Sequence, residues 1–487
     1  MSSNYRDQWA SVGGHFPAHW HFFKLEELLE NAKGIAVGVM YPGDHTAKGI
    51  PLIKVGDVKD GYIASQPSFF ISPEVDEEYK RTRLNGTELL ITLVGNPGDC
   101  VVVEPHMAGW NAARALAVVR LKDTNLREWL RYILLSKPAK HLIDARLNTT
   151  VQKTLNLKDI RELGIPIPPK HERDVITKII SAIEQKTIVN SNINQTLEQT
   201  AQALFKSWFV DFEPVKAKMA VLEVGGSQED ATLAAMTAIS GKDADALVVF
   251  EREHPEQYAE LKATAELFPS VMQDSELGEI PEGWNIGKFG DILEFNPKRL
   301  LKKGSIASYL DMKNVPVIGH SAQEIIEREF NSGSKFINGD TLLARITPCL
   351  ENGKTAYVDF LPANEIVGWG STEFIVMRSK KNLPLSLSYF FARLDSFRTI
   401  AIQSMQGTSG RQRADASVLE QHVWIVPPNE ILQKFGAISD LILGGNRSRN
   451  IENKSLSQLR DTLLPKLLSG EITLPEAEQA VSEAENV

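Results

Sequence analysis

The chain has 487 residues, of which 43% are hydrophobic and 24% are charged, a composition typical of a globular protein with several domains. No signal-peptide pattern opens the sequence, and no apolar run reaches the ~18 residues of a membrane span, so we expect a cytoplasmic protein. The two cysteines, Cys100 and Cys349, are too few for a disulfide framework or a cysteine metal site.

The net charge of −9 is unevenly distributed along the chain. Residues 212–277 hold 5 basic and 13 acidic residues, and residues 471–487 hold 5 acidic residues and no basic ones. The rest of the chain is therefore weakly basic. Because binding of an anionic polymer depends on local basic surface rather than on total charge, this acidity does not exclude a nucleic-acid ligand.

In chain order, the first large segment covers residues 14–150 and alternates short apolar runs with turn residues. The runs at 49–55, 88–94, 100–103 and 116–121 are bounded by Gly, Pro, Asn or Asp, which predicts strands. Residues 126–136 instead space their apolar side chains as one face of a helix. We predict an α+β body.

Residues 170–212 give the strongest helical pattern, because they contain no Gly or Pro before Phe212 and repeat apolar residues every seven positions. A second such seam occurs later in the chain, and both predict a coiled coil. The seam residues are Ile176, Ile183, Asn190, Leu197 and Leu204, then Phe435, Ile442, Arg449, Leu456 and Leu463. Asn190 and Arg449 interrupt the two seams at matching places, either as buried register markers or as solvent-facing residues. The sequence leaves both possibilities open.

The second half of the chain repeats the first. Three matches at the start of the copies, at an offset of 264, are Gly14 with Gly278, Pro17 with Pro281 and Trp20 with Trp284. The offset is 253 in mid-body and settles at 259 from Trp110 and Trp369 through the long helix. Strands are predicted at 289–295, 341–346, 355–358 and 373–378, and a helix at 387–397. A spacing near 260 indicates duplicated domains rather than a solenoid.

These patterns divide the chain into seven segments. They are an N-terminal arm (1–13), a first body (14–150), a central long-helix region (151–212), an acidic linker (213–277), a second body (278–412), a distal long-helix region (413–470) and an acidic tail (471–487). The linker fits a helical hairpin or a loose connection equally well. We expect the tail to be disordered because it is acidic and poor in apolar residues.

Three motifs resemble the specificity subunit of type I restriction-modification systems, over residues 14–470. They are Leu277-Gly278-Glu279-Ile280-Pro281-Glu282-Gly283-Trp284, Thr408-Ser409-Gly410-Arg411-Gln412 and Leu204-Phe205-Lys206-Ser207-Trp208-Phe209-Val210-Asp211-Phe212. The duplication itself is part of the resemblance. One departure is that the Glu found three residues after Pro-Pro is present as Glu172 but is Ile431 in the second copy.

The resemblance implies a fold and a set of partners. It implies two target-recognition domains, each recognising one half of a split sequence in double-stranded DNA, joined by two long antiparallel coiled-coil helices in a pseudo-twofold repeat. It implies two methyltransferase (modification) subunits docked on the helices, with endonuclease/translocase (restriction) subunits joining the complex. Catalysis, S-adenosylmethionine, ATP and Mg would then belong to the partner subunits, and this chain would be non-catalytic.

Candidate DNA contacts follow from residue chemistry, because phosphates need Lys or Arg and base edges suit Arg, Asn or Gln. In the first body they are Lys80, Arg81, Arg83, Asn96, Asn111 and Arg114. In the second body they are Lys298, Arg299, Lys302, Lys303, Lys313, Asn314, Arg345, Arg411, Gln412 and Arg413. The cluster from Lys298 to Lys303 is the strongest phosphate-binding hypothesis, because like charges in one loop repel unless an anion is near. Solvated surface charge is the alternative for each residue.

Patterns of catalysis are missing from the sequence. The two Pro-Pro pairs follow Ile167 and Val426, not the Asn or Asp of a DNA methyltransferase. Gly353-Lys354-Thr355 lacks the earlier Gly of a phosphate-binding loop, and His15, His19 and His21 lack the spacing of a zinc site. We therefore expect no catalytic residue, no metal and no cofactor in this chain.

Two other functions stay open on sequence alone. One is a pseudo-dimeric enzyme with a site between the bodies, which would need matched His, Asp, Glu or Cys residues. The aligned positions are instead Gly, Pro, Trp and aliphatic residues, which are structural types. The other is a coiled-coil adaptor without DNA specificity, which the divergence of the two bodies disfavours.

Overall fold

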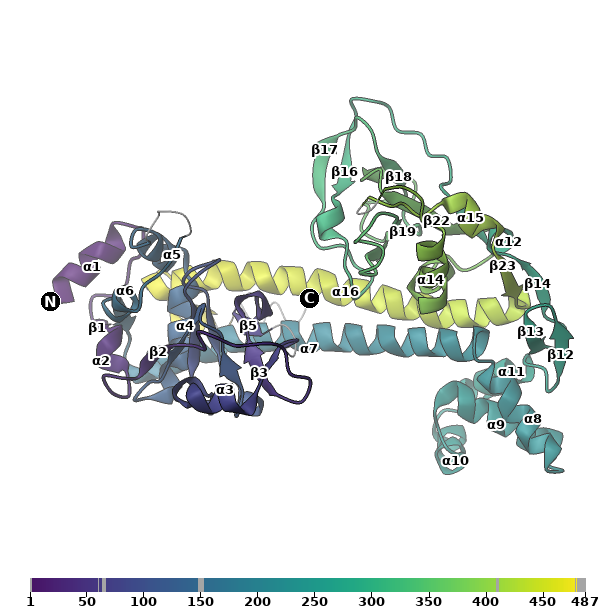
Figure 1. Cartoon of the computed structure of the whole chain (residues 1–487), viewed down its shortest axis with the longest axis horizontal. Coiled ribbons are helices and arrows are strands. Elements are labelled where there is room, and N and C mark those ends of the chain that lie inside the picture. Colours follow the sequence, from purple (N-terminus) through teal and green to yellow (C-terminus); the bar gives the residue numbers. More distant parts are fainter. Residues whose placement is uncertain are drawn as a thin grey trace. The chain divides into compact units, whose positions relative to one another are not determined.

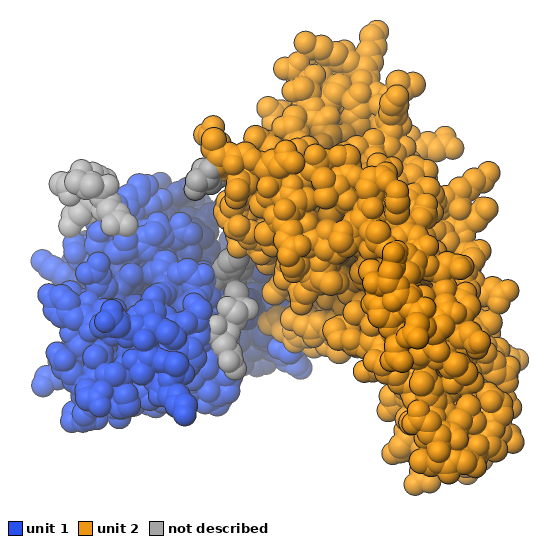
Figure 2. Space-filling model, turned by 45° about the vertical axis from the view of Figure 1, so that its right-hand side comes forward, with its two compact units in different colours: residues 1–187, 455–487 blue, residues 188–454 orange. Residues whose placement is uncertain are grey.

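The computed structural model describes residues 2–59, 61–63, 67–147, 153–408, 411–477 and 479. It is a mixed structure of helix and sheet, 46% helical. The chain divides into two compact units, coloured separately in Figure 2. Unit 1 comprises Met1–Thr187 and Ser455–Val487, and unit 2 comprises Ile188–Lys454. In the described part of the chain, no helix is long and apolar enough to cross a membrane.

The core of unit 1 is a four-stranded antiparallel sheet in the order β2-β10-β7-β8. This part of the chain is drawn in purple to blue in Figure 1. Its strands are β2 (Ile35–Val37), β7 (Leu89–Thr92), β8 (Cys100–Val102) and β10 (Leu116–Val119). Every residue of β7 and β10 is buried, as their largely apolar sequences predict. Side chains from α4 (Arg127–Leu135), α5 (Lys137–Asp144) and α6 (Leu157–Arg161) pack on this sheet.

Smaller elements complete unit 1. Strand β1 (His21–Lys24) pairs antiparallel with β11 (Gly164–Ile167), and β3 (Ile50–Ile53) lies between β6 (Phe70–Ile71) and β9 (Asn111–Ala112). Strands β4 (Val58–Lys59) and β5 (Tyr62–Ile63) form a hairpin. The remaining α-helices are α1 (Ser2–Ala10), α2 (Leu25–Leu28) and α3 (Pro73–Glu78).

Unit 2 repeats this plan in the same chain order. Its core sheet has the order β15-β22-β19-β20, with β15 (Leu293–Phe295), β19 (Thr341–Ala344), β20 (Thr355–Tyr357) and β22 (Phe374–Ser379). Strands β14 (Asn285–Lys288) and β23 (Val423–Val426) pair as β1 and β11 do. Helices α12 (Phe289–Ile292), α13 (Leu387–Arg393), α14 (Asp395–Gln403) and α15 (Ala416–Gln421) take the places of α2, α4, α5 and α6.

The second sheet of unit 2 is larger than its counterpart. It contains β16 (Ile306–Leu310), β17 (Ile326–Glu329), β18 (Ser334–Phe336) and β21 (Gly368–Gly370) in the order β17-β16-β21-β18. The parallel pair β16 and β21 corresponds to β3 and β9. The two bodies therefore share a core and differ in what extends from it.

The two long helices run through both units. Helix α7 is Lys170–Phe209 and α16 is Asn429–Ser469. Within unit 1, Ile176 and Ile183 near the start of α7 share an apolar cluster with Leu463 near the end of α16. Within unit 2, Phe205 near the end of α7 lies 5.1 Å from the ring of Phe435 near the start of α16. This is the contact pattern expected of antiparallel helices.

Several expectations need correction. Residues 289–292 form α12 instead of a strand, and the helix expected at 387–397 divides at Leu394 into α13 and α14. The N-terminal arm, for which no structure was predicted, contains α1, and its Trp9 donates a 2.7 Å hydrogen bond to the carbonyl of Gly164. In the tail, Leu474 and Ala477 pack on the unit 1 core, so disorder is wrong for residues 471–477. The expectation for residues 478 and 480–487 lies outside the described residues.

The linker is folded into helices rather than loose. Its helices are α8 (Glu213–Glu223), α9 (Gln228–Ser240), α10 (Ala244–Glu253) and α11 (Pro255–Glu266). They bury a small core that includes Ala235, Met236 and Leu247. The hairpin of β12 (Met272–Ser275) and β13 (Gly278–Pro281) then leads into the second body.

Candidate nucleic-acid interface

The loop after β15 carries the most exposed candidate cations. Lys298, Lys302 and Lys303 are exposed, and no ion pair involves any of them within the described ranges of the chain. Leu300 stands between them with 95% of its surface exposed. Three unpaired ammonium groups in one short loop raise the local positive potential and can bind an anion.

Arg299 belongs to the same loop but has a structural role. Its Nη2 lies 3.2 Å from Oδ1 of Asp340, a residue that is 0% exposed. Arg378 donates to the same oxygen at 2.7 Å. Burial raises the pKa of Asp340, and the two guanidinium groups and the Ile337 amide oppose that rise. Arg299 is therefore needed to compensate a buried carboxylate, and only the three lysines remain available to a ligand.

Candidates in unit 1 are mostly engaged within the protein. Arg83 lies 2.5 Å from a carboxylate oxygen of Asp76 and also pairs with Glu77. Asn111 is 0% exposed and donates to the other oxygen of Asp76 at 2.9 Å. It cannot reach a base edge in this conformation. Lys80 pairs with Glu77 at 2.8 Å on the surface, where such a pair contributes little and opens readily.

Three unit 1 candidates remain. Arg81 is exposed, but it donates to the backbone carbonyl of Lys33 at 3.0 Å. Arg114 and Asn96 are exposed at turns of the body. Among the candidates, unit 1 thus presents fewer free cations than the lysine loop of unit 2.

The other unit 2 candidates divide in the same way. Arg413 forms two-pronged contacts with Glu373 at 2.6–3.0 Å, and this hydrogen bonding lowers the pKa of Glu373. Asn314 donates to the carbonyl of Glu324, and Arg345 is half-buried. Lys313 and Arg411 are exposed, and Gln412 is half-buried beside the turn at Thr347. Ser409 and Gly410 of the expected motif lie outside the described residues.

The seam between the long helices changes character along its length. In unit 1 it is apolar, formed by Ile176 and Ile183 with Leu456 and Leu463. In unit 2, Asn190 is 4% exposed and donates to Glu452 at 2.8 Å and to Asn453 at 3.0 Å. Of the two interpretations of Asn190, the buried polar contact is therefore the observed one. Leu197, Leu204, Ile442 and Arg449 are only half-buried.

Comparison with known proteins decides the family. The chain is 32% identical over 375 residues to the type I restriction enzyme HindI specificity subunit of Haemophilus influenzae, covering 71% of this chain and 78% of that protein. The chain belongs to the family of type I restriction enzyme specificity subunits. Residues 17–199 also match the type I restriction modification DNA specificity domain.

Two further matches extend along nearly the whole specificity subunit. It is 23% identical over 479 residues to the MjaIX specificity subunit of Methanocaldococcus jannaschii, covering 95% of this chain and 96% of that one. The crystal structure of a type I S subunit from M. genitalium covers 92% of this chain and 96% of its own, with 13% identity and a TM-score of 0.48.

Sequence reasoning missed two buried carboxylates that bind arginines in this specificity subunit. Each body has one at the turn before its central strand: Glu88, which Arg120 contacts at 3.2 Å, and Asp340, which Arg378 contacts. The sequence contained a signal for these carboxylates. In each of the two aligned turns an acidic residue comes shortly after a glycine, in Gly86-Thr87-Glu88 and in Gly339-Asp340. Each body therefore has a buried ion pair beside this turn, although Asp340 aligns with Thr87 and not with Glu88.

Residues considered for catalysis have structural contacts. Lys354 donates to the carbonyl of Met312 at 2.8 Å, and His19 pairs with Glu172 at 2.9 Å. Among the described residues there is no group of three or more His, Cys, Asp or Glu that could hold a metal ion.

Proposed function

We propose that this specificity subunit recognises a split DNA sequence, with the body at 14–150 contacting one half and the body at 278–412 contacting the other. The observation that carries the proposal is that one order of strands and helices occurs twice, with the same core sheet. A duplicated core with different surface extensions suits two half-sites of different sequence.

The lysine loop after β15 supplies phosphate contacts in this proposal. Phosphate contacts fix the position of a protein on DNA, and base contacts then select the sequence. Lys298, Lys302 and Lys303 have the exposure and the free charge for the first task. Arg114 and Arg411 are exposed candidates on the two bodies for either task.

The long helices act as the spacer between half-sites. Helix α7 has 40 residues and α16 has 41, and a rise of ~1.5 Å per residue gives each a length of roughly 60 Å. Half-sites that face one side of DNA repeat every ~34 Å or a multiple of it. Two antiparallel helices of this length are sufficient to set such a separation.

Catalysis belongs to the partners in this proposal. The chain presents its repeated helical frame to two methyltransferase subunits, and restriction subunits join the assembly. S-adenosylmethionine, ATP and Mg bind to those partners, and this chain supplies recognition and scaffolding.

A body exchange tests the proposal. Residues 14–150 are replaced by the matching segment of the HindI specificity subunit, and the methylated motif is mapped in host DNA. We expect one half of the motif to change and the other half to remain. The reciprocal exchange of residues 278–412 is the matched control and should alter the other half only. A change of both halves in either chimera contradicts modular recognition, and methylation that ignores both exchanges favours an adaptor.

A further inference from the structure

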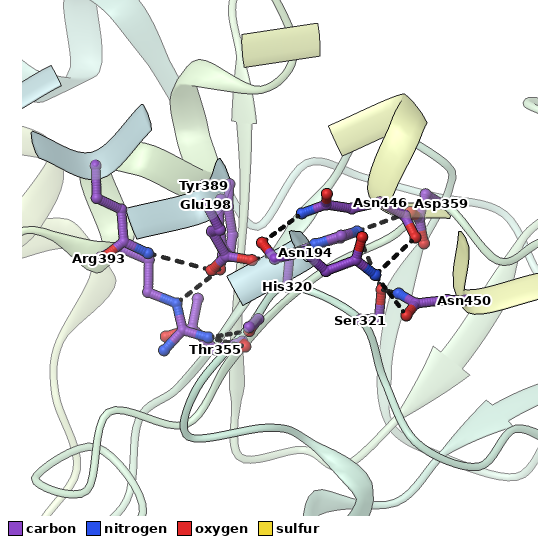
Figure 3. Close-up of polar contacts among 12 residues, drawn as sticks. Asn194, Glu198, His320, Ser321, Thr355, Asp359, Tyr389, Arg393, Asn446 and Asn450 are labelled. Atoms are coloured by element: carbon purple, nitrogen blue, oxygen red, sulfur yellow. Dashed lines mark hydrogen bonds and ion pairs between the residues drawn. The ribbon is translucent and has the colours of Figure 1, made fainter. Parts of the chain in front are cut away.

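A buried histidine in unit 2 lies between two carboxylates. His320 is 2% exposed, and its Nδ1 lies 3.3 Å from Oε2 of Glu198 on α7. Its Nε2 lies 3.2 Å from Oδ2 of Asp359, in the segment that follows β20. Figure 3 shows the imidazole between the two acidic groups. A neutral imidazole donates through only one nitrogen, so contacts with two carboxylates require the doubly protonated ring.

If His320 were neutral, the charged groups around it would not balance. The other oxygen of Glu198 accepts a hydrogen bond from the hydroxyl of Tyr389, which in turn accepts from Nε of Arg393 at 2.9 Å. The other nitrogens of Arg393 donate to backbone carbonyls, including those of Val317 and Thr355. Two carboxylates and one guanidinium leave a net negative charge, which a protonated His320 cancels. An uncompensated buried charge is strongly destabilising.

The cluster also reaches the second long helix. Asn450 on α16 donates to Oγ of Ser321 at 2.7 Å, and this oxygen lies 3.0 Å from Nε2 of His320. Asn194 on α7 donates to Asn450 at 2.9 Å (Figure 3). The loop that carries His320 is therefore bonded to both helices within unit 2.

We propose that His320 is a positioning residue that, as an imidazolium, fastens the body at 278–412 to Glu198 of α7 and so fixes this recognition body on the helices. The claim that this body recognises DNA rests on the proposed function. The fastening itself is a property of the fold and can be tested without DNA.

The charge of His320 makes this fastening sensitive to alkaline pH. Burial alone would lower the pKa of His320, but its contacts with Asp359 and Glu198 raise that pKa to about 9. Because the folded pKa exceeds the ordinary value near 6.5, the stabilisation is complete below pH 6.5 and is lost as the pH rises through about 9. Burial raises the pKa of Tyr389 well above 10, so its hydroxyl keeps its proton over this range.

Two measurements on the full chain test the inference. Nuclear magnetic resonance of histidine-labelled protein, with the His320 signal assigned by its loss in His320→Gln, should give a pKa near 9; a value at or below 6.5 overturns the inference. Hydrogen exchange, corrected for intrinsic rates, should show opening of residues 316–323 increase by roughly one to two orders of magnitude between pH 7 and pH 10. Opening that does not change over this range also overturns it.

A charge-rescue experiment distinguishes an ionic role of His320 from a packing role. His320→Gln should increase opening of residues 316–323 by roughly tenfold or more at pH 7, because two carboxylates then lie close together without their cation. Adding Glu198→Gln and Asp359→Asn should restore most of the protection, whereas a packing defect would not be restored. His254→Gln, an exposed histidine in the same unit, is the matched control. If His320→Gln does not fold, the exchange profile of the unchanged protein between pH 7 and pH 10 still decides, and absence of sequence-specific DNA binding would refute only the proposed function.

Discussion

In each unit, the body contacts a buried carboxylate of α7, but the two bodies supply different cations. In unit 1, Glu184 forms an ion pair with Arg131 of α4, accepts from the hydroxyl of Tyr132 at 3.2 Å and lies 3.8 Å from Arg460 of α16. In unit 2, Glu198 contacts His320 and Tyr389. Each carboxylate thus meets one tyrosine and one cation of its own body. The ionic contacts of the two bodies with α7 are chemically similar.

These contacts are not products of the sequence repeat. At the offset of 259, Glu184 aligns with Leu443 and Glu198 with Ser457, so neither carboxylate has an acidic counterpart. The sequence repeat therefore does not include these two carboxylates, and each body has its own ionic contact with α7. Because an arginine stays charged at any pH used in practice and a histidine does not, the two fastenings differ in their response to pH.

The largest effect is expected from breaking the unit 1 fastening. Arg131→Gln should reduce the free energy of unfolding of unit 1 by about 3–5 kcal/mol, because Glu184 remains buried without its main cation. Hydrogen exchange of unit 1 peptides at pH 7 and pH 10 gives the measurement, and the loss should be similar at both. Arg114→Gln, an exposed arginine in the same unit, is the control. If Arg131→Gln reduces the stability of unit 1 at pH 7 but not at pH 10, the contact with Glu184 depends on pH as the contact with Glu198 does. The described difference between the two contacts would then be wrong.

A smaller effect should follow from neutralising the lysine loop of unit 2. Replacing Lys298, Lys302 and Lys303 by Gln should weaken binding to all DNA sequences by up to about 2–3 kcal/mol at 0.1 M salt. It should also reduce the salt slope by about one for each phosphate that the loop no longer neutralises. Salt titration of binding by the subunit with its methyltransferase partner measures both quantities.

Arg299→Gln is the matched control for this loop. It removes a positive charge from the same segment, but it should destabilise unit 2 through Asp340 and leave the salt slope unchanged. If the three-lysine variant leaves the slope unchanged, the loop does not contact phosphate.

The third effect tests a close approach that has no equivalent in unit 1. A Cβ added to Gly436 on α16 would lie 2.0 Å from Pro384, so Gly436→Ala should destabilise unit 2 by about 1–2 kcal/mol after the gain in helix propensity is included. Gly444→Ala on the same helix has open space and should stabilise by up to about 1 kcal/mol. Denaturant unfolding measures both, and equal effects of the two substitutions would show that Pro384 yields.

Sequence patterns predicted the cores better than the surfaces. The strands Leu89–Thr92 and Thr341–Ala344 and the two long helices were predicted, because burial on both faces or on one helical stripe leaves a pattern along the chain. Strand β17, with four exposed residues, was missed because it has no buried face. In the linker, a helical hairpin was only one of two open alternatives, and the four helices were not predicted individually, since their small apolar core leaves little periodicity.

The candidate interface was harder to predict for a different reason. Whether an arginine is free depends on carboxylates distant in sequence, such as Asp340 for Arg299 and Glu373 for Arg413. His320 was not predicted at all, because its partners Glu198 and Asp359 come from other segments. Pairings of this kind follow from the fold and not from local composition.

The smallest effect on stability concerns the polar part of the seam. Asn190→Leu should change the free energy of unfolding of unit 2 by less than about 1–2 kcal/mol, because it exchanges two hydrogen bonds for apolar burial. The main effect of the substitution should be on the register of the two helices, since one buried asparagine can fix register at a cost in stability. If the helices set the separation of the half-sites, the variant should methylate targets with more than one spacer length. Ile183→Leu in the apolar part of the seam is the control, and it should keep a single spacer because apolar packing tolerates the exchange and no polar partner is removed.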